Sequence, residues 1–156
     1  MARTRLIDKG YKRIQRELLK MGASEVAIGI LGESALEADE NGFSLVDVAA
    51  VNEFGSDDGH VPERPAHRDT FERVRGQAGI RAEIAVNNVL HKGGTSKKQL
   101  NRLGLWYVGE LQQEITAFDD PPNAPATIAK KGADNPLIDT GRMKNSIQHE
   151  VRPRER

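Results

Sequence analysis

Apolar residues recur at helical spacing in three stretches of the chain. Spacings of three and four place each set on one face of a helix. The sets are Ile7, Tyr11, Ile14, Leu18 and Met21; Phe71, Val74, Ala78, Ala82, Ala85 and Val89; and Leu100, Leu103, Tyr107, Leu111, Ile115 and Phe118. Gly22 is well placed to end the first helix, and Gly93-Gly94 separates the other two, which predicts an antiparallel hairpin. We expect Ser96 and Gln99 to cap its second helix.

Two short stretches alternate with the period of a β-strand. In residues 25–32, Val26, Ile28 and Ile30 fall on one face, with small residues between them. Residues 147–151 near the end of the chain alternate in the same way. We expect this terminal strand to pair with the first one.

A further helix is predicted between the first strand and the long hairpin. Ser44 and Asp47 stand three residues apart, as in a capping box, and the helix should run to about Phe54. Gly55 follows at the position of a stop.

Two proline-containing segments interrupt the pattern, at about 56–66 and 119–136. Pro62 and Pro65 hold the first extended as a connecting arm. The second is a long excursion with four prolines and one expected helical turn at 126–131. The predicted fold is therefore one α+β domain over residues 1–156. It combines a small antiparallel sheet packed with a long helical hairpin and extended proline-rich arms.

Composition indicates a chain that is partly covered by partners. Hydrophobic residues make up 37% and aromatic residues 4%, below the usual apolar share of about 45–50%.

There is no cysteine, which fits synthesis in a reducing cytoplasm and leaves no thiolate site. No 18-residue apolar run is present, so we expect neither secretion nor a membrane span.

Charge is balanced in total but uneven along the chain. Lys plus Arg and Asp plus Glu each number 23, which argues against a chain that mainly neutralises phosphates. Residues 1–20 carry seven basic and two acidic side chains, whereas residues 21–63 carry ten acidic and no basic ones. Such asymmetry can steer association between copies or partners, and two ordinary solvated faces would give the same pattern.

The sharpest enzymatic signal is Asp139-Thr140-Gly141 after two apolar residues, which resembles the aspartic-protease signature. Arg142 follows where those enzymes usually have Ala or Ser, and no second half-site is present. A mostly helical chain also cannot supply their β-barrel. We therefore interpret Asp139 as a helix N-cap and Gly141 as a turn residue.

The other motifs also lack their chemical context. Residues 67–69 read His-Arg-Asp, as in a kinase catalytic loop, but the remaining kinase motifs are missing. The four histidines are scattered without metal-ligand spacing, at positions 60, 67, 91 and 149. We therefore predict no catalytic, metal or cofactor site and no enzyme. Lys130, Lys131, Arg142 and Lys144 could touch DNA without sequence preference, since stacking aromatics are few.

Several stretches in a fixed order resemble one protein family. They are Val48–Gly55, the arm Val61–Pro65, Arg68–Phe71, Pro121–Gly132 and Pro136–Ile147. In this order and spacing they are similar to the tail-completion, or virion-morphogenesis, proteins of long-tailed bacteriophages, including Mu-like phages. The similarity spans about Val26 to Val151. One departure is Ala66, because the family arm usually continues Arg-Pro-Phe.

The resemblance implies a structural virion protein that forms a homo-oligomeric ring, expected to hold six copies, in the phage neck. The ring would join a head-proximal connector (stopper) protein to the tail terminator or tail tube, with genomic DNA passing through, after assembly in the host cytoplasm. We expect the arm and the excursion to contact adjacent subunits or rings. The predicted interface residues are Val61, Pro62, Glu63, Arg64, Pro65, Pro122, Asn123, Pro125, Lys130, Lys131 and Arg142.

Two alternatives remain open from the sequence. A tail-terminator ring, which caps the tail tube before joining, has nearly the same expected features. A small DNA- or protein-binding module belongs to a different class. Zero net charge and low aromatic content count against that module.

Overall fold

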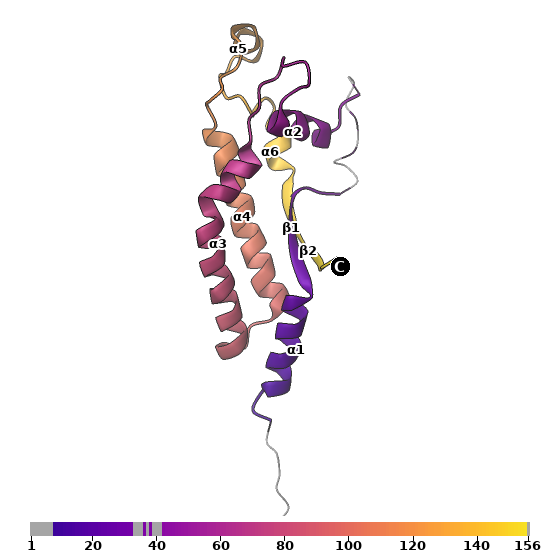
Figure 1. The fold of residues 1–156 in the computed structure, drawn as a ribbon, viewed down its shortest axis with the longest axis vertical. Coiled ribbons are helices and arrows are strands. Elements are labelled where there is room, and N and C mark those ends of the chain that lie inside the picture. Colours follow the sequence, from indigo (N-terminus) through magenta and orange to yellow (C-terminus); the bar gives the residue numbers. More distant parts are fainter. Residues whose placement is uncertain (1–7, 33–35, 37, 39–41, 156) are drawn as a thin grey trace, which may run out of the picture.

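The computed structural model describes residues 8–32, 36, 38 and 42–155. Within these ranges the fold is α+β, with six helices and a two-strand antiparallel sheet (Figure 1). The elements are α1 Tyr11–Gly22, β1 Ser24–Ile30, α2 Leu45–Phe54, α3 Ala66–His91, α4 Ser96–Ala117, α5 Pro125–Lys131, α6 Arg142–Asn145 and β2 Ile147–Pro153. The predicted fold class, hairpin and strand pairing are confirmed.

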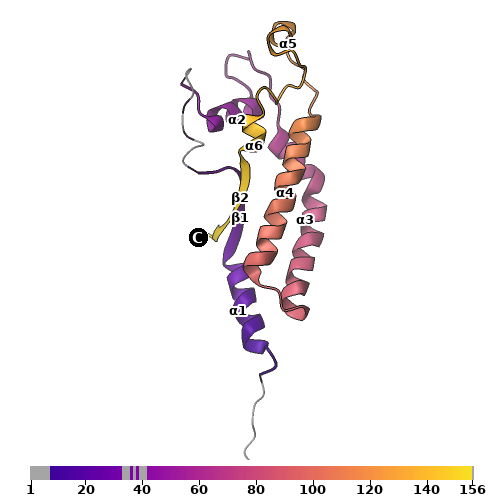
Figure 2. The same ribbon diagram turned by 180° about the vertical axis from the view of Figure 1, so that it is seen from behind.

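The molecule is elongated, with α4 in its middle. Helix α4 packs against the sheet and against α3, while α1 extends beyond one end of β1 (Figures 1 and 2). Helices α2, α5 and α6 gather at the opposite end (Figure 1). The main core joins α4 to the C-terminal segment and the start of α3, through Ala66, Val108, Leu111, Ile115, Leu137 and Ile147.

The sheet turns its apolar face towards α4. Val26 lies opposite Val151, and Ile28 lies opposite His149, so the predicted apolar face of β1 is shared by β2. His149 packs onto Gly104 of α4, where an added Cβ would lie 2.9 Å from the His149 Cβ and closer still to its ring. The absence of a side chain at Gly104 therefore lets helix and sheet approach closely.

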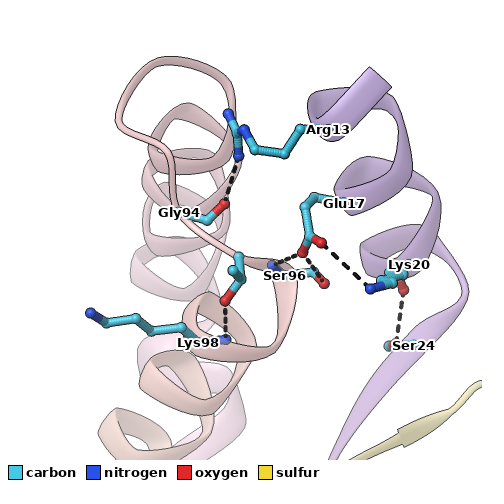
Figure 3. Close-up of polar contacts among 8 residues, drawn as sticks. Arg13, Glu17, Lys20, Ser24, Gly94, Ser96 and Lys98 are labelled. Atoms are coloured by element: carbon cyan, nitrogen blue, oxygen red, sulfur yellow. Dashed lines mark hydrogen bonds and ion pairs between the residues drawn. The ribbon is translucent and has the colours of Figure 1, made fainter. Parts of the chain in front are cut away.

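Helix α1 is fixed to the turn of the hairpin by a buried carboxylate. Glu17 Oε2 accepts hydrogen bonds from Ser96 N at 2.8 Å and Ser96 Oγ at 3.0 Å (Figure 3). These bonds, from the backbone first and the hydroxyl second, hold the pKa of Glu17 below its ordinary value, and Lys20 adds to the effect. A carboxylate from α1 thus satisfies a backbone donor at the start of α4.

The predicted capping box at Ser96 and Gln99 is wrong. Thr95 is the N-cap of α4, and its side chain accepts from Lys98 N at 3.4 Å. Ser96 is the first helical residue and turns to Glu17, while Gln99 Oε1 accepts from Asn88 Nδ2 at 3.0 Å. Thr95, one residue before Ser96, has the extended backbone conformation that an N-cap requires.

Arg13 closes the other side of this turn. Its guanidinium donates to Gly94 O at 3.2 Å, in the turn after α3 (Figure 3). It also donates to Val89 O at 3.0 Å, in the last turn of α3. A cation at a helix C-terminus also complements the helix dipole. The predicted first apolar stripe is only partly buried, since Tyr11 is 70% exposed, and Ile7 lies outside the described residues.

One expected member of the α3 stripe needs correction. In the α3 stripe Val74 and Val89 are buried, but Phe71 is exposed. Trp106 is half-buried at the edge of the hairpin, where Arg81 stacks over its ring at 4.3 Å and its Nε1 donates to Glu110 at 2.9 Å. Arg81 of α3 and Trp106 of α4 therefore contact each other across the hairpin, outside the core.

The short helix α6 begins differently from the prediction. Its N-cap is Gly141, at a φ of 77°, and Thr140 Oγ1 accepts from Arg142 N at 3.4 Å. Asp139 is therefore not the N-cap, whereas the turn role of Gly141 is confirmed. None of the helices in the described ranges has both the length and the apolar content needed to cross a bilayer.

Candidate protein-interaction site

The candidate site is built on α2, which starts with the predicted capping box. Asp47 N donates to Ser44 Oγ at 3.1 Å, and Ser44 N donates to Asp47 Oδ2 at 2.9 Å. The Ser44 hydroxyl also donates to Asp47 Oδ2, at 2.7 Å. This bond first, and the bond from Ser44 N second, hold the pKa of Asp47 below its ordinary value. Gly55 ends the helix at a φ of 77°. A Cβ added to Gly55 would lie only 3.1 Å from Val61 O. Only glycine fits there without strain.

The proline-containing arm after α2 is fastened to its own molecule. Ser56 N donates to Val61 O at 2.9 Å, and Val61 N donates to Ser56 Oγ at 2.8 Å, which closes a compact loop. Arg64 N then donates to Asn52 O at 2.7 Å. The arm is therefore less free than the sequence suggested, because both of its ends bind α2 or the residues that follow it.

Arg64 joins the arm to the long excursion. Its side chain donates from Nε to Pro121 O and from Nη2 to Pro122 O, both at 3.2 Å. The residue is only 7% exposed, and burial lowers the pKa of its guanidinium. Two segments about 57 residues apart in sequence thus become one surface.

A groove of about 530 Å³ lies between α2, the arm and the excursion. It is lined by five of the predicted interface residues, Val61, Pro62, Arg64, Pro122 and Asn123, with Val48 and Val51 of α2 as an apolar wall. Asn123 is 8% exposed, and within the described part of the chain its Nδ2 has no hydrogen-bond partner. A buried donor without a partner is costly, so this amide is a source of local instability beside the groove.

A second groove, of about 590 Å³, contains two more of the predicted residues. Lys131 and Arg142 line it together with Asp139. It shares Val48 and Asn52 with the first groove, so α2 forms part of both. Lys131 Nζ is already bound to Asn135 O at 2.8 Å.

The remaining predicted residues lie outside both grooves. Glu63 forms an ion pair with Arg68 on the surface, and Pro65 stands at the N-cap of α3. Pro125 opens α5, and Lys130 is exposed on the same short helix. Arg64 and Asn123 are buried, so their part in any contact is to shape the groove or to donate within it.

The lining of the first groove limits the chemistry that this end of the molecule can offer. The first groove has apolar walls, with a buried amide donor and a guanidinium that is already engaged. Such a lining offers mainly apolar surface, which suits the apolar side chains of another polypeptide segment. Over the described ranges, no three histidine or acidic side chains are grouped as a metal site would require.

Sequence reasoning missed two features. Glu17 falls between Ile14 and Leu18 on the inward face of α1, and an acidic residue in that position signals a buried partner. The outer surface of α2 was also missed, although Leu45–Phe54 contains only two charged residues.

Comparison of the sequence with protein-family models and with curated proteins gives no match, and comparison of the fold with solved structures gives none either.

Proposed function

We propose that this chain is a structural virion protein of a long-tailed bacteriophage. It forms a ring in the neck that completes the tail and joins it to the head, with DNA passing through the ring. The proposal starts from the ordered motifs between Val48 and Ile147 that resemble tail-completion proteins. Its partners would be the head-proximal connector protein and the tail terminator or tail tube.

One structural observation gives the proposal its main support. The motif stretches are far apart in sequence, yet Val48, Val61, Pro122 and Arg142 all line grooves at the α2 end of the molecule (Figure 1). Arg64 binds two of these stretches together. A constructed surface with apolar walls and a buried donor supports a role in contacting other proteins.

The experiment introduces a stop codon early in the gene, in the genome that encodes the chain, and images the lysate by electron microscopy. The proposal expects complete heads and complete tails that remain separate. Supplying the intact chain in trans should restore joined particles. Joined, infectious particles in the lysate without the chain would overturn the proposal.

A matched pair of variants tests the groove without breaking the fold. Ala124→Trp fills the first groove, because Ala124 is an exposed lining residue. Ala126→Trp adds the same bulk two residues further along, at an exposed position of α5 outside that lining. We expect Ala126→Trp to restore joining and Ala124→Trp to fail. Deleting the excursion would be less informative, because it would leave the buried Arg64 guanidinium without its carbonyl acceptors.

A further inference from the structure

The end of the molecule that holds α1 and the turn between α3 and α4 is strongly basic. Residues 8–23 and 91–102 contain nine Lys or Arg side chains and only two acidic ones. The two stretches are in contact, because Glu17 of α1 accepts hydrogen bonds from Ser96 at the start of α4 (Figure 3). We call this surface the basic pole, and its cations are Lys9, Lys12, Arg13, Arg16, Lys20, Lys92, Lys97, Lys98 and Arg102.

Few of these charges are neutralised inside the pole. Glu17 is buried and pairs with Lys20 at 3.5 Å, and Asp8 accepts a hydrogen bond from Gly10 N at 2.9 Å. Arg13 is already engaged by carbonyl groups at the turn. The other seven basic side chains form no ion pair with the part of the chain that the structure describes. The pole therefore keeps a large excess of positive charge.

The elements packed against the pole do not cancel this excess. The nearest acidic residue of α3 is Glu83, eight residues or about 12 Å before the end of the helix. The nearest one of α4 is Glu110, which is held by Arg73, and in the sheet Glu25 is paired with Arg152. The other charged residues near the end of the sheet are Glu150, Arg154 and Glu155. Residues 1–7 contain no Asp or Glu.

Part of the positive charge is arranged in a row. Lys12, Arg16 and Lys20 are exposed and follow one another at a spacing of four, so they lie along one side of α1. The row is about 12 Å long. Duplex DNA carries one negative charge per about 1.7 Å of its axis, so a row of this length can contact several phosphates at once.

The residue types of the pole favour DNA over an acidic protein. Six of its nine cations are Lys, which is depleted at protein–protein interfaces but is a regular contact of DNA phosphates. Tyr11 is the one aromatic residue in residues 8–23 and 91–102. A single ring cannot stack the successive bases of a single strand, so the double helix is the better fit.

We infer that the basic pole binds the phosphate backbone of duplex DNA without sequence preference. This inference deepens the proposed function and rests on it for the partner: in the proposed ring the pole faces the DNA path. The grooves lie at the opposite end of the molecule and stay free for protein partners (Figures 1 and 2). The basic residues between 130 and 144 are a weaker DNA contact, because Lys131 is bound to Asn135 O and two aspartates lie in the same stretch.

Fluorescence anisotropy of the purified full chain with two labelled duplexes of unrelated sequence tests the contact. Both duplexes should bind with similar affinity, and binding should weaken at least about tenfold between about 50 and 200 mM salt. The double variant Lys12→Gln with Arg16→Gln removes two exposed cations of the row. It should bind about tenfold or more weakly at low salt, and its slope of log affinity against log salt should fall by about two.

The matched control removes two exposed cations outside the pole. Arg68→Gln with Arg75→Gln changes charge by the same amount on α3, where each arginine pairs with a glutamate. This control should bind DNA like the wild type. Unfolding curves of both double variants, matching that of the wild type, show that the fold is kept.

Four results would overturn the inference. They are a wild type that does not bind duplex DNA at low salt, a pole variant that binds like the wild type, a control that loses as much affinity as the pole variant, and polyglutamate that binds the pole as tightly as DNA. The last result would assign the pole to an acidic protein. A chain that binds DNA through the pole, although heads and tails join without it, would uphold this contact and remove the proposed function.

Discussion

Two glycines of α4 show how single residues set the approach of helix and sheet. Gly104→Ala should lower the free energy of unfolding by about 1–3 kcal/mol, because the new Cβ would collide with the His149 side chain. Gly109→Ala on the same helix meets nothing within 4 Å and should raise stability by about 0.5–1 kcal/mol. Urea unfolding of both variants measures the difference. Equal effects of the two substitutions would contradict the packing of α4 on β2.

Glu17 should make stability depend on pH. Its pKa is lowered in the folded state by hydrogen bonds from Ser96, so its contribution is present above the ordinary Glu pKa and is lost as pH falls through the lowered value. Unfolding curves of Glu17→Gln should therefore lie below the wild type at neutral pH and converge with it in acid. Glu83→Gln, at an exposed position of α3, should show no such convergence. A constant gap between Glu17→Gln and wild type at all pH values would argue against the Ser96 contact.

At the scale of elements, the sequence predicted those helices, strands and helix ends that are set by hydrophobic periodicity or by a glycine. The long helices, the strand pair and the end of α2 at Gly55 follow from local spacing and backbone freedom. It did not predict that Thr95 precedes α4 as the cap, since two neighbouring hydroxyls look alike until Glu17 binds one of them. The exposure of Phe71 could not be predicted either, because it depends on which face of α3 meets α4.

The candidate site was predictable only in part. The prolines marked the two segments, but the spacing gave no reason to expect that Arg64 would reach across to Pro121 and Pro122. That bond depends on tertiary folding, and it turns two expected arms into one grooved surface. The interface role of these residues stays a prediction.

The Arg64 contact has its own test. Arg64→Met should cost about 1.5–3 kcal/mol, the scale of hydrogen bonds to a charged group, and should expose residues 119–136 to proteases. Arg68→Met removes an exposed ion pair with Glu63 and should cost much less, because solvent screens such a pair. Unfolding curves with limited proteolysis measure both effects. An excursion that stays protected in Arg64→Met would show that the arm and the excursion are held together by other contacts.

At the scale of the whole molecule, the two ends have different character. One end carries the grooves and the apolar α2, whereas the other carries the basic helix α1 (Figure 1). An elongated subunit with different surfaces at its ends is suited to joining unlike partners and to contacting copies of itself. This polarity supports the proposed place between head and tail.

The most direct measurement is a cryo-electron microscopy reconstruction of the neck of the particles encoded by the same genome. The account predicts a closed ring of this fold between the head connector and the tail, with the DNA path through its centre. A neck that is completely accounted for by other proteins, with this chain absent from the particle, would contradict the account.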